Sequence, residues 1–491
     1  MNFETIIGLE VHAQLLTKSK MYCRCSADYA NTPPNTHVCP VCLGLPGVLP
    51  TINQQAVEYT VMTALALHCT ISDYSKFDRK NYHYPDLMKG YQISQFDAPF
   101  GNGGWINIEV NDEKKKIGIT RVHLEEDVAK LVHQTSPSGE NYSLVDVNRA
   151  GVPLMEIVGE PDLRSPEEAR QYLIKLRSIL QYLGVSTGNM EEGSFRCDAN
   201  ISIRPENSTE LLAKVEVKNM NSFRAVYRAL SYEAKRQRKA AAEGKRLVQE
   251  TRGWVENKGK TVSQRSKEYA HDYRYFPEPD LPPILLNQDW IEEIKTKIPE
   301  LPEAKRDRFI SEYGLPLYDA NLLTSSKTIA DYAEDFINTG QPQNLSITER
   351  AKLGSNWILG EVNRILNVHN INITNFREKV NPEQLSRLVT LNSQSVVNIA
   401  TAKTMLEEMF NTGKEANAII KDKGLNQISD IQEIREIVSQ IVEANDQAVA
   451  DYKIGKVQAV KFLLGQVMKA TRGRANPGTA NKLIKEKLEE K

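Results

Sequence analysis

Glu10 and His12, two side chains able to bind a metal or move a proton, stand two residues apart in the stretch Ile6–Leu15. Apolar residues alternate through this stretch. Because successive side chains of a β-strand point to opposite faces, the alternation predicts a strand with one face on a hydrophobic core and with Glu10 and His12 on the other. Antiparallel sheets commonly leave one face in water. Taken alone, this strand therefore also fits an ordinary solvated surface.

Three later predicted strands each direct a carboxylate away from the core. They are 119–128 with Glu125, 152–158 with Glu156, and 196–204 with Asp198. If these strands share a sheet with Ile6–Leu15, several oxygens and one imidazole nitrogen converge. Such a set suits Mg²⁺, which usually meets one or two protein carboxylates together with substrate phosphates. The pattern predicts a magnesium site for nucleotide chemistry. The alternative is a set of unrelated surface carboxylates paired with arginines.

A phosphate-binding segment is predicted where a strand leads into a helix. Lys218 ends the strand, Asn221 or Ser222 caps the helix, and Arg224 follows in its first turn. Helix N-termini bind phosphate through their free backbone N–H groups. The sequence holds no glycine-rich Walker loop, so a nucleotide site here is of another kind. An ordinary capped helix is the alternative.

Four of the six cysteines lie close together in the sequence, as two pairs. They are Cys23, Cys25, Cys39 and Cys42. Two close pairs of thiolates are typical of a closed structural zinc site, although the first pair is spaced more tightly than usual. A closed site has no open position, so we assign it no catalytic role. Free thiols or an oxidised disulfide are the alternatives, and Cys69 and Cys197 are predicted to pack in the core.

Composition places limits on partners and location. The formal net charge of -1 gives no general attraction to nucleic acid, so an RNA partner requires a local basic patch. No apolar run approaches the roughly 20 residues of a membrane span. The N-terminus leads directly into a strand, without a signal or transit pattern. We expect a cytoplasmic protein with no membrane association, and not an organelle-imported precursor.

Three domains are predicted from the change in pattern along the chain. Residues 1–295 are rich in short alternating segments and turn signals. Residues 296–405 show helical spacing, and residues 406–491 form a further helical segment. The predicted fold class is α+β, with a β-rich domain followed by an all-α domain and a helical tail.

Several long motifs resemble one known family. They are Gly8-Leu9-Glu10-Val11-His12, Cys39 to Gly47, Phe77 to Tyr84, His123-Leu124-Glu125-Glu126-Asp127, Gly193 to Asn200, Asp272 to Leu281, and Gly465-Gln466-Val467-Met468-Lys469. Together they resemble the B subunit of the aspartyl/glutamyl-tRNA amidotransferase, from Ile6 to the last helix. The resemblance implies a β-rich cradle domain, a helical domain and a C-terminal tail similar to the YqeY family.

The resemblance also implies a glutamine-hydrolysing, ATP-dependent ligase built as a heterotrimer. The A subunit releases ammonia from glutamine, the ammonia reaches the B subunit through a tunnel, and the small C subunit forms a belt around both. The B subunit uses ATP and Mg²⁺ to phosphorylate the side-chain carboxyl of glutamate mischarged on tRNA(Gln), or of aspartate on tRNA(Asn). Ammonia then displaces phosphate. Phosphoryl transfer depends on positioning and charge neutralisation, which a carboxylate cluster with Mg²⁺ supplies.

The motif match also implies roles for particular residues. Those expected to bind Mg²⁺ or to line the tunnel mouth are Glu10, His12, Glu125, Glu156 and Asp198, and the first three are expected to be catalytic. Contacts to the nucleotide phosphates are expected from Lys80, Lys218 and Arg274. Contacts to the tRNA backbone are expected from Lys469, Arg472 and Arg474 in the tail. Some family members lack the cysteine quartet, which agrees with structural zinc.

The chain departs from the family pattern at two places. Met88 replaces the usual proline, and Val128-Ala129 replaces the usual Ala-Gly. Both are peripheral to the carboxylates. Two alternatives to the enzyme remain at this point. One is a non-catalytic tRNA-binding zinc protein whose carboxylates only brace the fold. The other is an assembly scaffold in which the tail alone binds tRNA.

Overall fold

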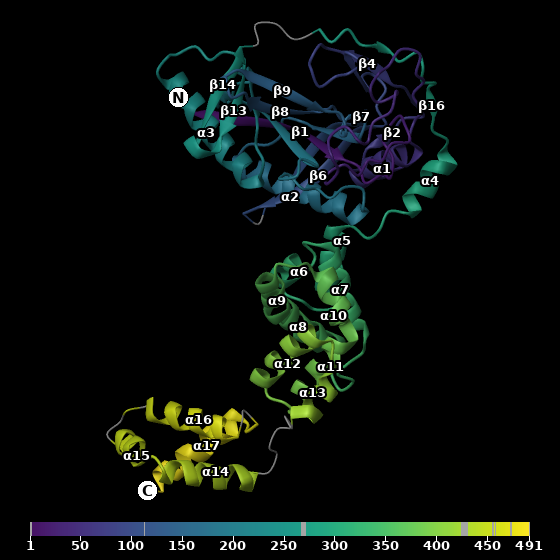
Figure 1. The fold of residues 1–491 in the computed structure, drawn as a ribbon. Coiled ribbons are helices and arrows are strands. Elements are labelled where there is room, and N and C mark those ends of the chain that lie inside the picture. The colour runs from purple at the N-terminus through teal and green to yellow at the C-terminus, as the bar shows by residue number, and fades with distance from the viewer. Residues whose placement is uncertain are drawn as a thin grey trace. The chain divides into compact units, whose positions relative to one another are not determined.

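The computed structural model describes residues 2–111, 113–266, 272–423, 431–453, 456, 458–471 and 474–490. The chain forms two compact units, Met1–Leu301 and Pro302–Lys491. Figure 1 shows that the N-terminal unit combines strands with helices, whereas the C-terminal unit is helical. The predicted α+β fold class is therefore confirmed.

A nine-stranded sheet runs through the described part of the N-terminal unit in the order β14-β13-β12-β11-β1-β10-β7-β6-β2. Its strands are β1 (Phe3–Gln14), β2 (Thr70–Ile71), β6 (Gly101–Val110), β7 (Glu113–Glu126), β10 (Pro153–Gly159), β11 (Phe195–Pro205), β12 (Val215–Lys218), β13 (Glu250–Val255) and β14 (Lys260–Ser266). Strand β1 pairs antiparallel with β11 and β10, and β10 pairs antiparallel with β7. The four strands predicted to carry the carboxylates are therefore consecutive in one sheet.

One face of this sheet packs on the main hydrophobic core. The alternation in β1 buries Ile7, Leu9 and Val11 almost completely. The helices that supply the other side of the core are α1 (Gln54–Ala66), α2 (Pro166–Leu183) and α3 (Phe223–Ala242) (Figure 1). The hydroxyl of Ser222 caps α3 by accepting from the N–H of Ala225. The opposite face of the sheet is left for polar side chains.

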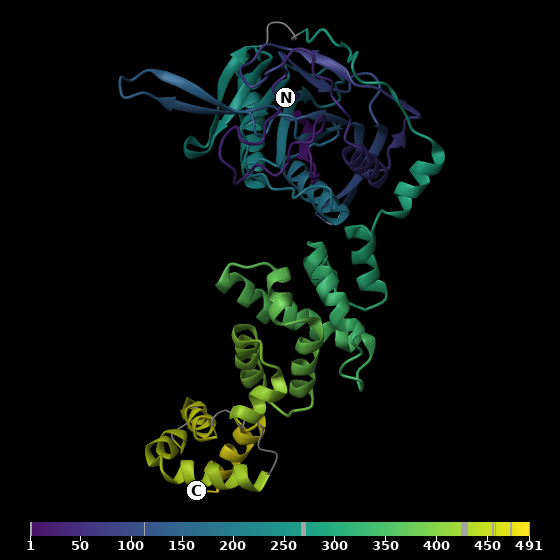
Figure 2. The same cartoon turned by 45° about the vertical axis from the view of Figure 1, so that its right-hand side comes forward.

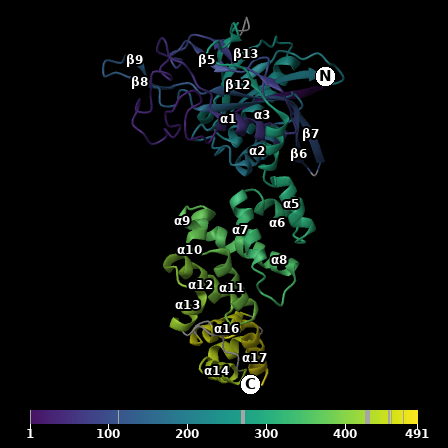
Figure 3. The same cartoon turned by 90° about the vertical axis from the view of Figure 1, so that its right-hand side faces the viewer.

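Smaller elements surround the sheet. A three-stranded sheet consists of β4 (Asp78–Asn81), β5 (Tyr91–Ser94) and β15 (Phe276–Pro277). The remaining described elements of the unit are β3 (Tyr74–Ser75) paired with β16 (Ile284–Leu285), β8 (Lys130–Thr135) paired with β9 (Asn141–Asp146), a 3₁₀ turn at Glu256–Lys258, and α4 (Gln288–Thr296). Figures 2 and 3 show the β8–β9 hairpin extending away from the body of the unit. The three-stranded sheet matters for the site because β4 carries Lys80.

The C-terminal unit contains two separate hydrophobic clusters. One extends from Phe309 to Ile420 and the other from Ile434 to Leu488. Its helices are α5 (Pro302–Ser311), α6 (Leu317–Leu323), α7 (Lys327–Asn338), α8 (Ile347–Trp357), a π-helical turn (Ile358–Val362), α9 (Asn363–His369), α10 (Ile373–Lys379), α11 (Pro382–Ser393), α12 (Ile399–Thr412), α13 (Ala416–Lys423), α14 (Ile431–Glu443), α15 (Asp446–Lys453), α16 (Gln458–Ala470) and α17 (Pro477–Glu489). The first cluster includes residues of α13, which lie beyond the predicted boundary at residue 405. The division into three domains stays a prediction.

Two further observations concern the helices. Asn476 caps α17 and Pro477 opens it, as the Asn-Pro pair predicts. None of the helices in the described ranges is long and apolar enough to cross a membrane.

Candidate catalytic and metal sites

Three predicted site residues meet on the polar face of the sheet. The register places His12 of β1 opposite Glu156 of β10, and Glu125 enters from β7, the next strand. The Nε2 atom of His12 lies 3.5 Å from Oε2 of Glu156 and 3.7 Å from Oε1 of Glu125. One ligand atom from each of the three residues lies within 4.8 Å of the other two. We call these three residues the carboxylate cluster.

The charges of the carboxylate cluster balance one another. Burial lowers the pKa of His12, but the Glu156 and Glu125 carboxylates outweigh burial and raise it to about 9. Burial likewise raises the pKa of Glu156, but His123 and His12 more than compensate and hold it well below its usual range. His12 thus acts as a cation among buried carboxylates. A divalent cation supplies the same compensation without protons. Octahedral Mg²⁺ holds its ligands at about 2.0–2.1 Å, so neighbouring ligand atoms lie about 2.9 Å apart and opposite ones about 4.1 Å apart. The distances of 3.5 and 3.7 Å from His12 to the two carboxylates fall between these values.

Glu10 and Asp198 form a second pair on the same face. They lie opposite each other on β1 and β11. Glu10 accepts a hydrogen bond of 2.9 Å from Nδ2 of Asn200, and Asp198 accepts one of 2.7 Å from Nζ of Lys218. The five residues predicted as Mg²⁺ ligands are therefore divided, with three in the carboxylate cluster and two beside it. Lys218, predicted as a phosphate ligand, is held by two carboxylates, since its Nζ also lies 3.3 Å from Oε1 of Glu216.

Several supporting residues were not assigned a role from the sequence. His123 Nε2 lies 3.1 Å from Oε2 of Glu156, and the Ser94 hydroxyl donates to Oε2 of Glu125 over 3.1 Å. Asp127 accepts from Nε2 of Gln14 over 2.7 Å and forms an ion pair of 3.0 Å with Arg196. His123 and Asp127 lie in one of the motifs that resemble the family, and that motif could have identified them as site residues. Ser94 lies on a short strand distant in sequence, and no local pattern distinguishes it.

Lys80 is the predicted phosphate ligand that best matches an anion site. Burial lowers its pKa, but the Glu125 and Glu156 carboxylates raise it above its usual range. Its Nζ lies 5.1 Å from the centre of the Tyr273 ring, and it forms no hydrogen bond or ion pair with any residue in the described ranges. Arg274 is exposed and has a positive φ of 44°. Lys80 therefore places a positive charge near the carboxylate cluster, and its direct contact among the described residues is with the Tyr273 ring.

The four cysteines of the predicted zinc site are brought together. One sulfur from each of Cys23, Cys25, Cys39 and Cys42 lies within 4.8 Å of the other three. Tetrahedral zinc with Zn–S bonds of about 2.3 Å separates its sulfurs by roughly 3.8 Å, so the quartet fits such an ion. A hydrogen bond from Cys23, assisted by the nearby Lys20 ammonium, lowers the pKa of Cys42 to about 5. By contrast, burial raises the pKa of Cys69 to about 12.

The predicted tRNA contacts in the tail lie near the end of α16. Lys469 is exposed in the last turn of that helix. Nε of Arg474 donates to the carbonyl of Thr471 over 3.2 Å, so the start of its guanidinium is held by the backbone. Arg472 lies outside the described residues. The positions of Lys469 and Arg474 do not test the tRNA contacts, which stay a prediction.

Known protein families and individual proteins match this chain over nearly its whole length. The family described as "GatB/GatE catalytic domain" matches residues 5–292, and the one described as "GatB domain" matches residues 344–488. A protein of Dehalococcoides mccartyi (strain CBDB1) is 61% identical over 488 residues, covering 99% of each chain. A protein of Carboxydothermus hydrogenoformans is 51% identical over 486 residues, covering 99% of each chain. One of Thermoanaerobacter pseudethanolicus is 54% identical over 489 residues, covering 99% of this chain and 100% of its own. All three are named as the B subunit of the aspartyl/glutamyl-tRNA(Asn/Gln) amidotransferase.

Proposed function

This chain belongs to the family of aspartyl/glutamyl-tRNA(Asn/Gln) amidotransferase B subunits, and we propose that it activates and amidates the amino acid carried by a mischarged tRNA. The γ-phosphoryl group of ATP moves to the side-chain carboxylate of glutamate or aspartate, and ADP leaves. Ammonia then attacks the acyl phosphate, phosphate leaves, and the amide remains on the tRNA. The reaction requires the glutaminase, or A, subunit for its ammonia, and we propose that the belt, or C, subunit completes the assembly.

The observation that carries this proposal is the convergence of His12, Glu125 and Glu156 from three neighbouring strands onto one face of the sheet. A set of only structural carboxylates has no need of three titratable groups within 4.8 Å of one another. Buried like charges repel, and they are kept where a cation or a substrate uses them. This favours the enzyme over the two non-catalytic alternatives.

The residues of the chain have separate tasks in the proposed reaction. Mg²⁺, when bound, neutralises phosphate charge and aligns the attacking and leaving oxygens. His12, Glu125 and Glu156 would hold it. Glu10 lies beside the carboxylate cluster, where a carboxylate is suited to accept a proton as ammonia becomes an amide. Lys80 would contact the transferring phosphoryl group.

Three further assignments complete the proposal. Lys218 and Arg274 would contribute to the phosphate site at its edges, and Asp198 would orient Lys218 through their 2.7 Å ion pair. The cysteine quartet would hold structural zinc. Lys469, Arg472 and Arg474 would contact the tRNA backbone, which positions the tRNA without reading its sequence. A cytoplasmic location stays a prediction.

The test is amide formation by the assembled enzyme. The chain is purified with its glutaminase and belt partners and given mischarged glutamyl-tRNA, glutamine, Mg²⁺ and ATP, and glutaminyl-tRNA is measured. We expect product only with ATP, and aspartyl-tRNA is tested in parallel to define the substrate. The variants Glu10→Ala and Glu125→Ala should abolish product while tRNA binding is retained. Full activity in both variants, or no product from either tRNA with intact assembled protein, contradicts the proposal.

A further inference from the structure

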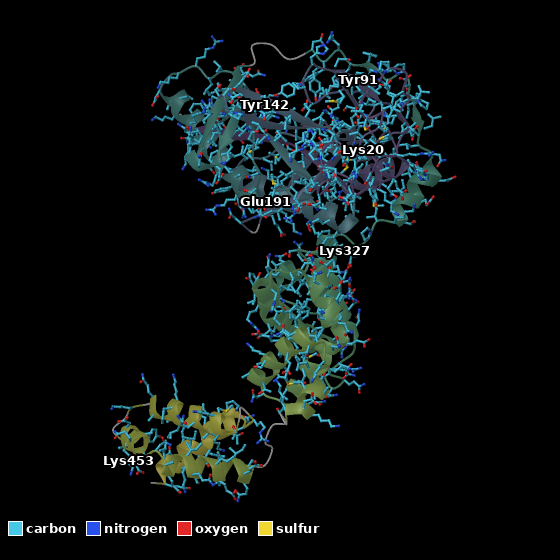
Figure 4. All side chains as sticks on the ribbon, in the orientation of Figure 1. Lys20, Tyr91, Tyr142, Glu191, Lys327 and Lys453 are labelled. Carbon is cyan, nitrogen blue, oxygen red and sulfur yellow. The ribbon has the colours of Figure 1, made fainter. Side chains whose placement is uncertain are left out.

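Lys20 is a fully buried lysine in the N-terminal unit. Its relative exposure is 1%, and it is among the largest fully buried side chains of the described residues. Figure 4, in which Lys20 is labelled, shows the side chain within the body of that unit. An isolated ammonium moved out of water loses a large hydration free energy unless an opposite charge compensates it. The burial of Lys20 therefore demands an anion.

The direct partners of Lys20 are carbonyl groups. Nζ donates to the carbonyl of His37 over 2.8 Å and to that of Val147 over 3.3 Å. Among the described residues, no carboxylate lies within 4 Å of it. Two neutral acceptors satisfy two of the three N–H groups of an ammonium but leave its full charge uncompensated. The missing negative charge has to come from another kind of group nearby.

Lys20 lies beside the cysteine quartet. The backbone N–H of Lys20 donates to the carbonyl of Cys25 over 2.9 Å. A Cβ placed on Gly151 would lie 3.5 Å from Cδ of Lys20 and 3.8 Å from Cβ of Cys42, so the lysine side chain and Cys42 flank the same glycine. His37, whose carbonyl accepts from Lys20, lies two residues before Cys39. Lys20 thus adjoins both cysteine pairs.

Zinc bound by four thiolates carries a formal charge of two minus. Such a centre needs positive charge close by as much as a buried ammonium needs negative charge. We propose that the Lys20 ammonium is the fixed counter-charge of the four-cysteine centre, and that it raises the affinity of the centre for zinc. This rests on the zinc assignment made above. Lys20 is a positioning residue here, because it acts on the metal through the thiolates.

A purely structural role for Lys20 makes a different prediction. If Lys20 only bridges the carbonyls of His37 and Val147, its loss destabilises the zinc-bound and zinc-free protein equally and leaves zinc affinity unchanged. If it is the counter-charge, its loss destabilises the zinc-bound protein more, because the thiolates lose their cation. In the zinc-free protein an uncompensated ammonium is removed, so the loss of stability is smaller or reversed. The two roles are therefore separable by one thermodynamic cycle.

The experiment uses the full-length chain and measures the zinc dissociation constant by competition with a chromophoric chelator. For Lys20→Met we expect zinc affinity about 10–100-fold weaker, the range found when groups supporting a metal centre are removed. Lys20→Gln, which keeps an N–H donor but no charge, should be similarly weak. Lys18→Met is the matched control, because Lys18 is exposed two residues away, and it should bind zinc as the wild type does. Urea unfolding of each protein, with zinc and with excess chelator, completes the cycle.

Each outcome bears on one assignment. Weaker zinc binding in both Lys20 variants, with a larger stability loss in zinc than in chelator, supports the counter-charge. Unchanged affinity in Lys20→Met, or affinity restored in Lys20→Gln alone, overturns it in favour of hydrogen bonding. If Lys20→Met does not fold, the affinity of Lys20→Gln decides. If the wild type itself binds no zinc, the zinc assignment fails, while amide formation by the assembled enzyme is tested independently.

Discussion

The carboxylate cluster and the cysteine quartet are two candidate metal sites, built in different ways within one unit. The quartet takes all four ligands from Cys23 to Cys42, a single loop, and offers soft sulfur that closes around an ion. The carboxylate cluster takes its ligands from three strands and offers oxygen and imidazole nitrogen. A closed arrangement of the first kind is typical of structural zinc sites. The second, if it holds Mg²⁺ as proposed, would leave coordination positions for substrate phosphates.

The largest effect should come from removing one charge from the carboxylate cluster. Glu125→Gln keeps the shape of the side chain but weakens its hold on a divalent cation, so we expect amide formation to fall by at least about 100-fold. Zinc content should stay at the wild-type level. The measurements are initial rates of product formation over a range of Mg²⁺ concentrations, and metal analysis. Glu113→Gln, an exposed substitution on the same strand, is the control and should be fully active. If Glu125→Gln and Glu113→Gln formed product at equal rates, the carboxylate cluster would have no role in catalysis.

A substitution in the cysteine quartet should affect the stability of the fold more than the rate of catalysis. Cys39→Ser breaks the quartet, so zinc no longer stabilises the folded state. With free zinc at 1,000 times its dissociation constant, this loss is about 4 kcal/mol. Urea unfolding monitored by tryptophan fluorescence measures it. With excess chelator, the variant and the wild type should unfold at nearly the same urea concentration. A difference that persists in chelator would show that Cys39 stabilises the fold by packing and not through a metal.

The contrast between the two sites also explains what the sequence could predict. The quartet was predictable because Cys23, Cys25, Cys39 and Cys42 are close along the chain, and their spacing alone limits the geometry. The faces of the strands were predictable too, since period-two alternation fixes which side chains share a face. Which strands lie next to each other was not predictable, because pairing between β1 and β10 depends on contacts between residues far apart in sequence. The grouping of His12 with Glu156, while Glu10 lies opposite Asp198, follows from register. The hydrophobic pattern fixes the face on which each side chain lies, but it does not identify which residue of a distant strand lies opposite.

Interactions that complete a site through distant residues were the least predictable. Lys80 reaches the carboxylate cluster from a separate small sheet, and Ser94 on the adjacent strand supports Glu125. Arg196 appears in the sequence as one of several polar residues on a strand, but only the fold places it 3.0 Å from Asp127. Ion pairs of this kind, between a buried carboxylate and a half-buried arginine, depend on exact side-chain positions. The residue types were visible in the sequence, whereas their partners were not.

Asp127 connects the two sites, and its replacement should have an intermediate effect. Its backbone carbonyl accepts from the N–H of Gly151, whose own carbonyl accepts from Met21 beside the cysteine loop. Asp127→Asn leaves the Arg196 charge without its buried partner, but Arg196 is one-third exposed, so we expect a loss of about 1–3 kcal/mol at pH 7. Urea unfolding measures it. Asp28→Asn, at an exposed position, is the control and should change stability little.

The pH dependence of this effect has a defined sign. Burial raises the pKa of Asp127, but Arg196 and Arg149 outweigh it and lower the pKa below its usual value. A carboxyl with a lowered folded-state pKa contributes stability above its unfolded pKa of about 3.9 and loses it as the pH falls through the folded value. The difference between wild type and Asp127→Asn should therefore be constant above about pH 4 and shrink below it. A difference that grows on acidification would contradict this account.

The smallest effect should come from a cysteine outside the quartet. Cys69 is 7% exposed, and its pKa of about 12 keeps it a neutral thiol at physiological pH, so it packs as a small apolar side chain. Cys69→Ala should lower the free energy of unfolding by about 1 kcal/mol, the typical cost of a modest core change. Zinc content and the rate of amide formation should not change, because the substitution touches neither site. Alkylation of the zinc-free wild type should modify Cys42 well before Cys69, since the thiolate is the reactive form. If Cys69→Ala lost zinc, the metal would have to be held by a different set of sulfurs, and the division between closed sulfur site and open oxygen site would need to be redrawn around Cys69.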